Sequence, residues 1–138
     1  MWTVRLEGGP RRVNLAVVAV DDKICSFGGH CTGEDYTNRT PIDVHTLDTV
    51  PLRWTPLQTE SNRDVVPFKR YGHTIVFYAD CVYLWGGRDD NGPYSTLYSF
   101  GTYTKMRTRP KVFSEVPWPR DGHSACVIGK RMFVFGGL

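Results

Sequence analysis

The 138-residue sequence has no long hydrophobic run: its longest apolar stretch, Leu15 to Val20, is far shorter than the roughly 20 residues of a membrane-spanning helix. The amino terminus also has no basic segment followed by a long apolar one, so no secretory signal is readable. Cysteine is scarce, and Cys25, Cys31, Cys81 and Cys126 are too few for a disulfide scaffold of this length. We therefore expect reduced thiols, no membrane partner and a location in the cytoplasm or nucleus.

A strong charge of one sign is also absent. The 17 basic and 14 acidic residues leave a net charge of +3, which is too small to indicate direct nucleic-acid binding. Neither G-x-G-x-x-G nor a P-loop motif occurs, so no nucleotide is expected. Cys25, His30 and Cys31 lie close together, but no second pair with metal-ligand spacing follows. The sequence therefore predicts no metal and no cofactor.

Glycine and proline, by contrast, are plentiful, with 14 and 9 residues, and they mark an internal repeat. Each of three units begins with an arginine and ends with two glycines: Arg12 to Gly28-Gly29, Arg70 to Gly86-Gly87, and Arg120 to Gly136-Gly137. The arginine always precedes the first glycine by 16 residues, whereas successive glycine pairs are 58 and 50 residues apart. A unit of fixed length is thus separated by loops of variable length.

Each unit contains two apolar runs around a short polar break, which is the pattern of a β-hairpin. These runs cover residues 13–20 and 24–27, 74–78 and 82–85, and 124–128 and 132–135. They lack helical spacing, so we expect strands that are buried on both faces. Further strands are predicted at 42–47, 52–55, 96–100 and 105–109. Four short strands in a repeat of about 50 residues predict an all-β chain of the β-propeller type, and no segment favours a helix.

The repeated units resemble the kelch repeat family over the whole chain. The resemblance rests on Arg70-Tyr71-Gly72-His73, on Arg120-Asp121-Gly122-His123, on the three glycine pairs and on Trp54 in a predicted fourth strand. It implies about two and a half blades of four-stranded antiparallel sheet in an open ring. The expected parts are a closing outer strand in 1–9, blade one in 10–57, blade two in 66–112 and the inner half of blade three in 117–138. We accordingly expect a truncated product of a longer gene.

Three residues depart from the kelch pattern. Leu15 stands where the motif histidine of blade one belongs, Arg107 stands where the tryptophan of blade two belongs, and Gly101 replaces an acidic turn residue. A large buried aromatic at the second position would supply much of the contact with the neighbouring blade. We therefore expect an irregular outer strand in blade two.

The resemblance implies a peptide-binding site at the mouth of the central channel. The matching residues precede the innermost strands or follow the glycine pairs: Arg12, Arg70, Arg120, His30, Arg88, Asp89 and Asp90. The planar guanidinium group grips a carboxylate through two hydrogen bonds, so an anionic peptide end or acidic motif is the expected ligand. For Arg12, Arg70 and Arg120 the alternative, pairing with neighbouring carbonyls or carboxylates, is favoured. Arg88 lies in a predicted loop and is favoured as a ligand contact.

Other conspicuous side chains receive structural interpretations. His73 and His123 recur at one repeat position, which favours hydrogen bonding within the fold over catalysis or metal binding. The aromatic side chains of Trp54, Trp85, Phe133 and Phe135 are expected in the core. The strand cysteines Cys25, Cys81 and Cys126 are expected to behave as small apolar residues.

For function, the kelch resemblance implies a non-enzymatic protein-binding module. It implies more specifically a substrate receptor of a cullin-2 RING ubiquitin ligase that captures C-terminal degrons ending in glycine, with elongin and cullin-2 docking on a longer parent chain. One alternative is a chromatin-associated or scaffold kelch protein, with a link to meiosis. Another is a fragment without a function of its own, which self-associates through the exposed strand 131–135. The least favoured is a copper or iron enzyme, which would need more ligands than His73 and His123.

Overall fold

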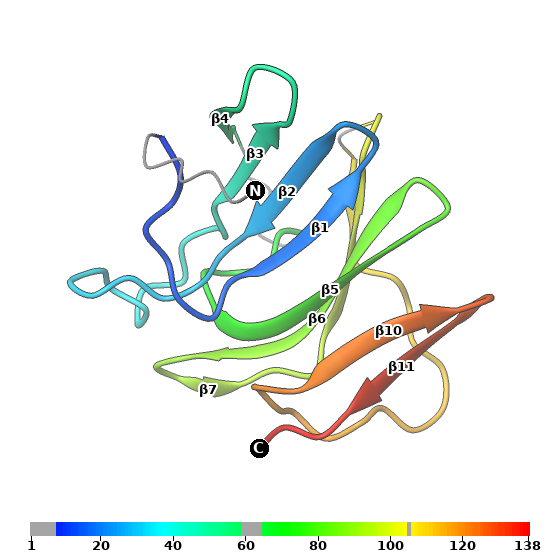
Figure 1. Ribbon diagram of the computed structural model, residues 1–138. Coiled ribbons are helices and arrows are strands. Elements are labelled where there is room, and N and C mark those ends of the chain that lie inside the picture. The colour runs from blue at the N-terminus through cyan, green and yellow to red at the C-terminus, as the bar shows by residue number, and fades with distance from the viewer. Residues whose placement is uncertain (1–7, 59–64, 105) are drawn as a thin grey trace.

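The computed structural model describes residues 8–58, 65–104 and 106–138, and the regular elements in these ranges are all β-strands (Figure 1). Blade one is an antiparallel sheet of β1 (Ala16–Val20), β2 (Lys23–Phe27), β3 (Val44–Asp48) and β4 (Arg53–Leu57), in that order. Among the described residues there is no helix with the length and apolar character that a membrane crossing needs. The prediction of an all-β fold is confirmed.

Blade two repeats this arrangement and blade three contributes a hairpin. The strands of blade two are β5 (Tyr71–Tyr78), β6 (Cys81–Asp89), β8 (Leu97–Gly101) and β9 (Arg107–Thr108), with the short β7 (Gly92–Pro93) paired to the end of β6. The hairpin is formed by β10 (Ser124–Ile128) and β11 (Arg131–Phe135). The first strands, β1, β5 and β10, lie side by side, so the sheets fan out from them (Figure 1). This is the arrangement of a partial, open propeller.

Several predicted strand limits need correction. The first strand begins at Ala16, and Val13 forms only an isolated bridge with His30. The predicted strand at 105–109 shrinks to the two residues of β9, against five in β4 of blade one. A short outer strand in blade two was the expected consequence of Arg107. The predicted closing strand falls largely on residues 1–7, outside the described residues.

Burial on both faces is wrong for the hairpin of blade three. Phe133 is 47% exposed and Phe135 is 84% exposed, so the expectation that both are core residues is also wrong. Along β11 the side chains alternate between exposed and half-buried, which is the pattern of a sheet covered on one face. Self-association through this apolar surface stays a prediction.

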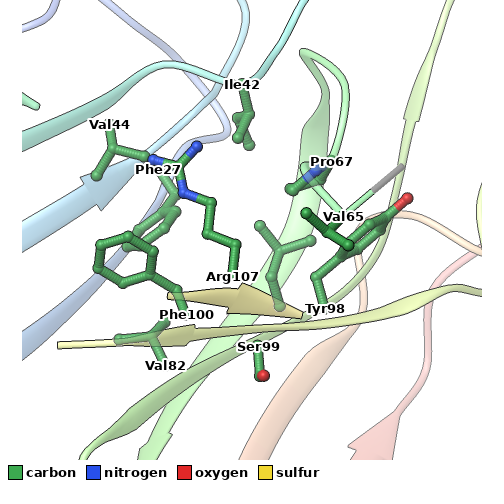
Figure 2. Close-up of a pocket in the computed structure, with 11 residues that line it drawn as sticks. Phe27, Ile42, Val44, Val65, Pro67, Val82, Tyr98, Ser99, Phe100 and Arg107 are labelled. Carbon is green, nitrogen blue, oxygen red and sulfur yellow. The ribbon is translucent and has the colours of Figure 1, made fainter. Parts of the chain in front are cut away.

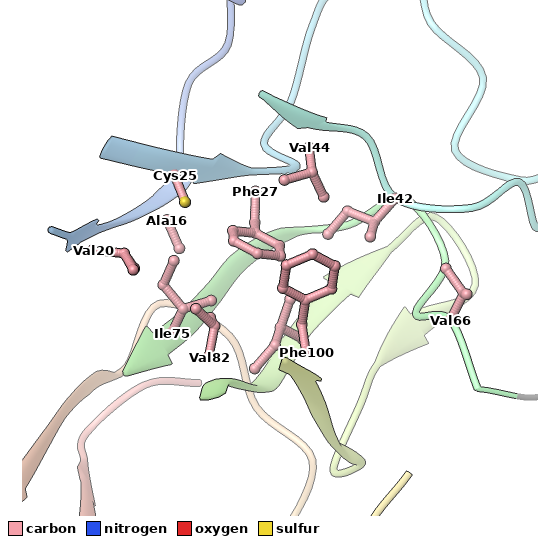
Figure 3. Close-up of a cluster of buried hydrophobic side chains, with 11 residues drawn as sticks. Ala16, Val20, Cys25, Phe27, Ile42, Val44, Val66, Ile75, Val82 and Phe100 are labelled. Carbon is pink, nitrogen blue, oxygen red and sulfur yellow. The ribbon is translucent and has the colours of Figure 1, made fainter. Parts of the chain in front are cut away.

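The largest apolar cluster lies between blades one and two (Figure 3). Phe27 of β2 meets Phe100 of β8 edge to face, with ring centroids 6.0 Å apart. Around this pair pack apolar side chains from both blades, namely Ala16, Val20, Cys25, Ile42, Val44, Val66, Ile75, Val82 and Leu84. Edge-to-face aromatic pairs add about 0.5–1.5 kcal/mol beyond the burial of their surface. Blades one and two are therefore joined as two packed layers.

Arg107 reaches into this interface from β9. Its guanidinium carbon lies 5.2 Å from the centre of the Phe100 ring, a distance at which a cation is attracted by the ring face. Figure 2 shows Arg107 extending towards Phe27 and Val44, beside a small cavity of about 20 Å³. The long side chain thus occupies the space between the blades where the family pattern has tryptophan.

The glycine pairs explain how one blade can approach the next. A Cβ added to Gly28 would lie 2.7 Å from the carbonyl oxygen of Arg70 and 3.1 Å from Cε1 of His73. The equivalent Cβ on Gly86 would lie 2.9 Å from the Arg120 oxygen and 2.5 Å from Cε1 of His123. The first glycine of each pair is therefore the place where the next blade packs onto the backbone.

Backbone hydrogen bonds repeat along the same seam. The N–H of Gly29 donates to the Arg70 carbonyl at 2.9 Å, and the N–H of Gly87 donates to the Arg120 carbonyl at 2.9 Å. The N–H of Gly122 donates to the Gly72 carbonyl at 2.9 Å. The motif arginine and the glycine pair of neighbouring blades are thus partners in one contact.

The motif histidines link the blades with their side chains. Nε2 of His73 lies 3.1 Å from the carbonyl oxygen of Phe27 in blade one. Nε2 of His123 lies 2.8 Å from the Thr74 hydroxyl of blade two, and its ring packs edge to face on the Trp85 ring at 4.9 Å. Burial lowers the pKa of His73 to about 3, with a further contribution from the Arg70 charge. Both imidazoles therefore act as links between blades, and His73 is neutral at pH 7.

Substitution at the first glycine should separate a packing effect from backbone strain. Gly86 and Gly136 have φ angles of 69° and 72°, but no atom lies within 4 Å of a Cβ added to Gly136. We expect Gly86→Ala to lower the free energy of unfolding by about 1–3 kcal/mol more than Gly136→Ala, because only the former meets His123. Urea denaturation of both variants checks this, and equal losses would contradict the blade-packing role.

The neutral His73 should make the fold sensitive to mild acid. The pKa in the folded chain, about 3, lies below the ordinary value of 6.5, so the stabilisation is complete above pH 6.5 and is lost as the pH falls towards 3. From this residue the free energy of unfolding should fall by about 1 kcal/mol per pH unit near pH 6 and approach about 1.4 kcal/mol per pH unit below about pH 5.5. Urea denaturation between pH 7 and pH 5 tests this, with His73→Gln expected to give a shallower slope. Equal slopes would show that His73 is not the titrating group.

Candidate functional site

The residues predicted to bind a ligand gather at one end of the blades. They lie in the segments that lead into β1, β5 and β10, in the loop after β2 and at the end of β6, on the left of Figure 1. The prediction that Arg88 lies in a loop is wrong, because Arg88 pairs within β6 with Tyr71 and Pro93. The loop after β2 contacts the hairpin of β6 and β7 directly. The N–H of Asp90 donates to the Tyr36 carbonyl at 3.4 Å, and the Asn91 amide donates to the Thr37 carbonyl at 3.2 Å. We call this end the loop end.

Arg12 is held by acidic side chains of its own blade. Its Nη1 donates to Oε2 of Glu34 at 2.7 Å and to the Tyr36 hydroxyl at 3.1 Å, and its Nη2 lies 3.0 Å from Oδ2 of Asp43. Lys69 reaches the same Glu34 oxygen from the segment before β5, at 2.9 Å. The hydrogen bond from Arg12 is the largest cause that lowers the pKa of Glu34 to about 2. Glu34 therefore joins blade one to the start of blade two.

Arg70 is fully buried, with 0% of its surface exposed. Its Nε donates to the Phe68 carbonyl at 3.0 Å and its Nη1 to the Gly86 carbonyl at 3.1 Å. The guanidinium stacks over the Tyr94 ring at 4.1 Å, which compensates part of the cost of burying a charge. A ligand cannot reach this group, so the prediction of Arg70 as a ligand contact is corrected to the structural alternative.

Arg120 makes the same two contacts in blade three. Its Nε donates to the Trp118 carbonyl at 3.2 Å and its Nη1 to the Gly136 carbonyl at 3.1 Å. The constant interval of 16 residues between the arginine and the first glycine thus has a physical cause, because this hydrogen bond spans 16 positions in both blades. In blade one, Arg12 pairs with Glu34 and Asp43 instead.

Asp89 is buried to 1% exposure and does not face solvent. Its carboxylate accepts hydrogen bonds from the Asn91 N–H at 2.8 Å and from the Tyr94 hydroxyl. Burial, followed by the hydrogen bond to Asp89, raises the pKa of Tyr94 to about 12. The prediction of Asp89 as a ligand contact is therefore also corrected, since the carboxylate holds the β6–β7 hairpin. The neighbouring Asp90 is exposed.

His30 belongs to an aromatic cluster that the sequence patterns did not reveal. Its ring stacks on Tyr36 at 5.1 Å and meets Tyr71 edge to face at 5.2 Å, and the two tyrosine rings are 5.7 Å apart. The Tyr36 hydroxyl donates to the Gly29 carbonyl at 2.9 Å, which fixes the cluster behind the glycine pair. Tyr71 occupies the variable position of its R-x-G-H motif. The motif therefore does not predict an aromatic side chain there.

Arg88 has a more accessible side chain than Arg12 or Arg70. Its side chain is 43% exposed, and its Nη1 lies 3.9 Å from Oδ1 of Asp121, the long limit of an ion pair. Its Nε is buried and has no hydrogen-bond partner among the described residues. In the sheet register Arg88 lies opposite Tyr71, next to the aromatic cluster. This guanidinium therefore retains donors for an anionic ligand.

Metal ligands are not grouped at this end or elsewhere in the described ranges. Within 8–58, 65–104 and 106–138, no three His, Cys, Asp or Glu side chains are placed to hold a metal ion. Cys25, Cys31, Cys81 and Cys126 form no disulfide among the described residues, and three of them lie in strands as expected. The chemistry available at the loop end is thus hydrogen bonding, charge pairing and aromatic contact.

Antiparallel sheets that fan out from their first strands define a propeller-type domain. A family model described as the KLHDC2/KLHL20/DRC7 Kelch-repeats domain matches residues 14–138. The chain is 52% identical over 142 residues to Kelch domain-containing protein 3 of Homo sapiens and of Bos taurus, covering 99% of this chain and 37% of those proteins. It is 34% identical over 105 residues to Rab9 effector protein with kelch motifs of Bos taurus, covering 72% of this chain and 27% of that protein.

The chain belongs to the kelch repeat family, a fold of protein-binding modules. It spans 37% of the length of the Kelch domain-containing protein 3 sequences and a smaller share of the Rab9 effector. The predicted resemblance is confirmed, and a partial kelch propeller is the fold that the sheets display.

Replacing Glu34 should weaken the link between blades one and two at the loop end. Glu34→Gln removes the charge shared by Arg12 and Lys69, and because the Glu34 side chain is 31% exposed we expect a loss of only about 0.5–1 kcal/mol. With a pKa of about 2 in the fold against 4.5 ordinarily, this stabilisation is complete above pH 4.5 and is lost as the pH falls towards 2. Denaturation at pH 7 and pH 3 tests it, with the exposed Glu115→Gln as the control. A loss no larger than that of the control would contradict the link.

Proposed function

We propose that this protein-binding module captures the C-terminal end of partner proteins, with Arg88 as the contact for the terminal carboxylate. The observation that carries the proposal is the Arg88 side chain, which is 43% exposed and lies 3.9 Å from Asp121, the long limit of an ion pair. A carboxylate can accept from Nη1 and Nη2 of one arginine in a bidentate, charge-assisted pair. A protein C-terminus supplies such a carboxylate without any modification.

The preferred terminal residue in this proposal is glycine. Arg88 is flanked by Tyr71 across the β-sheet and by Asp121 from the turn before β10. A terminal glycine has no side chain to accommodate in such surroundings, so its carboxylate can approach Arg88 closely. His30 and Tyr71 then offer aromatic surface to the residues that precede the glycine.

In cells, the proposed role is that of the substrate receptor in a cullin-2 RING ubiquitin ligase. Support comes from membership of the kelch family and from the 52% identity to Kelch domain-containing protein 3. Elongin and cullin-2 are proposed as partners of a longer parent protein, and the proposed location is the cytoplasm and nucleus. A chromatin-associated or scaffold role without C-terminal recognition is the competing outcome of the experiment below.

Peptide binding separates these roles. A labelled peptide ending in Gly-Gly with a free carboxylate should bind the protein, and the same peptide with a C-terminal amide should bind at least about tenfold more weakly, because hydrogen bonds to charged groups contribute about 1.5–3 kcal/mol. Fluorescence anisotropy gives both dissociation constants. Arg88→Ala should abolish the difference between the two peptides, while Arg88→Lys should restore only part of it.

The matched control is Arg11→Ala, because Arg11 is an exposed arginine in the segment that leads into β1. This variant should keep the preference for the free carboxylate. Equal affinity for the acid and the amide in the wild-type protein would reject C-terminal recognition and favour the scaffold role.

A further inference from the structure

A second concave feature lies at the opposite end of the blades, where the strands are joined by tight turns. The β1–β2 turn, with Asp21 and Asp22, lies beside the β8–β9 turn, with Thr102 and Tyr103 (Figure 1). Between them is a cleft of about 300 Å³. Its two walls come from blade one and blade two. We call it the turn-end cleft.

The two walls are tied together by one hydrogen bond. The hydroxyl of Tyr103 donates to Oδ2 of Asp21 at 2.7 Å, over a sequence separation of 82 residues. The base of the second turn is fixed by Thr102, whose N–H and hydroxyl both donate to the Asp80 carbonyl at 3.0 Å. The cleft therefore has a defined rim.

The lining of the turn-end cleft is divided by polarity. Val20, Leu57 and Phe100 supply apolar surface, and Val20 and Phe100 are themselves buried members of the interblade core. Asp21 and Asp22 are exposed and supply carboxylates at the rim. An elongated group with an apolar stem and a polar tip would satisfy both parts of such a cleft.

The sign of the charge at the rim is negative near Tyr103. The pKa of the exposed Tyr103 hydroxyl is raised, first by its hydrogen bond to Asp21, then by the charge of Asp21 and further by that of Asp80. Lys23 also lines the cleft and offsets part of this charge. Tyr103 is 65% exposed, and an aromatic ring at such a rim can attract a cation.

We propose that the turn-end cleft binds a lysine or arginine side chain from a basic segment of a partner protein. The methylene stem packs on Val20, Leu57 and Phe100, and the cationic head pairs with Asp21 and Asp22 beside the Tyr103 ring. Charge complementarity selects this occupant: an acidic side chain would face two carboxylates, and a purely apolar one would leave them unpaired with the ligand. The site is distinct from the loop end and does not rest on the proposed recognition of C-terminal carboxylates.

Photo-crosslinking with short peptides tests the proposal. The probe is acetyl-Gly-benzoylphenylalanine-Arg-Gly-Gly-amide, whose amide removes the carboxylate that the loop end is proposed to recognise. Matched probes carry norleucine or glutamate in place of arginine. On irradiation with the 138-residue chain, mass spectrometry should locate the arginine probe on residues 20–25 and 100–104, with a yield at least fivefold above that of either matched probe.

Asparagine variants of the two rim carboxylates then test whether their negative charge binds the arginine probe. Asp22→Asn should lower the yield of the arginine probe at least threefold, and the double variant Asp21→Asn with Asp22→Asn should reduce it to the level of the norleucine probe. The asparagine oxygen at position 21 can still accept from Tyr103, so the rim is preserved. Glu115→Gln, which removes an exposed carboxylate in the segment between β9 and β10, should leave the yield unchanged.

The proposal is overturned by any of three results: equal labelling by the norleucine probe, labelling by the arginine probe confined to other segments, or an unchanged yield in the double variant. None of these results bears on C-terminal recognition, because every probe is amidated. Conversely, failure of the free-carboxylate peptides at the loop end leaves this experiment valid.

Discussion

The contact on which the structure depends is the approach of one blade's turn to the bare backbone of the blade before it. The carbonyl oxygen of Arg70 accepts from the Gly29 N–H and would lie only 2.7 Å from a Cβ on Gly28, and the His73 ring lies 3.1 Å from that same point. A side chain at that glycine would force two sheets apart. The glycine pair and the R-x-G-H turn are therefore complementary halves of one interface, carried by adjacent blades rather than by one.

This constraint also decides which arginines are free to bind a ligand. Arg70 and Arg120 each donate two hydrogen bonds to backbone carbonyls of their own blade, one at the first glycine of the pair and one two residues before the arginine. Their guanidinium groups therefore stabilise the blade. Burying the Arg70 charge is tolerated because the carbonyls and the Tyr94 ring replace part of its hydration. The proposed ligand contact is left to a side chain just beyond the glycines, Arg88, whose guanidinium approaches Asp121 of the next blade at 3.9 Å while the side chain stays 43% exposed.

Periodicity predicted the strands well because the fold itself is periodic. The interval of 16 residues reports a hydrogen bond that recurs in blades two and three, and the arginine at position 107 correctly marked a weak outer strand. Periodicity says which side chains share a face of a sheet, but not whether another layer covers that face. This is why Phe133 and Phe135 were wrongly placed in the core.

Site residues outside the repeat had no comparable signal. Glu34 and Tyr36 lie in a loop without a counterpart in the other units, and they meet Arg12 from 22 and 24 positions away. Such pairings depend on the path of a loop, which spacing does not encode. Tyr103 and Asp21 are a similar case, since two separate turns are brought together only after the blades have packed.

The packing of blade two on blade one therefore positions both the loop end and the turn-end cleft. The two ends differ in whether loop length or only side chains can change. The link of His73 to Phe27 and the packing of Phe27 on Phe100 set the relative placement of blades one and two, and so set both the loop end and the turn-end cleft. Loops after the glycine pairs can change length without altering that link, which suits them to hold a specific site. The turns opposite are held to hairpin geometry, so variation there is confined to side chains such as Asp22 on a fixed frame. Because close packing transmits displacement, a change at the interblade link would move both ends together, whereas a change at Arg88 or Asp22 would stay local.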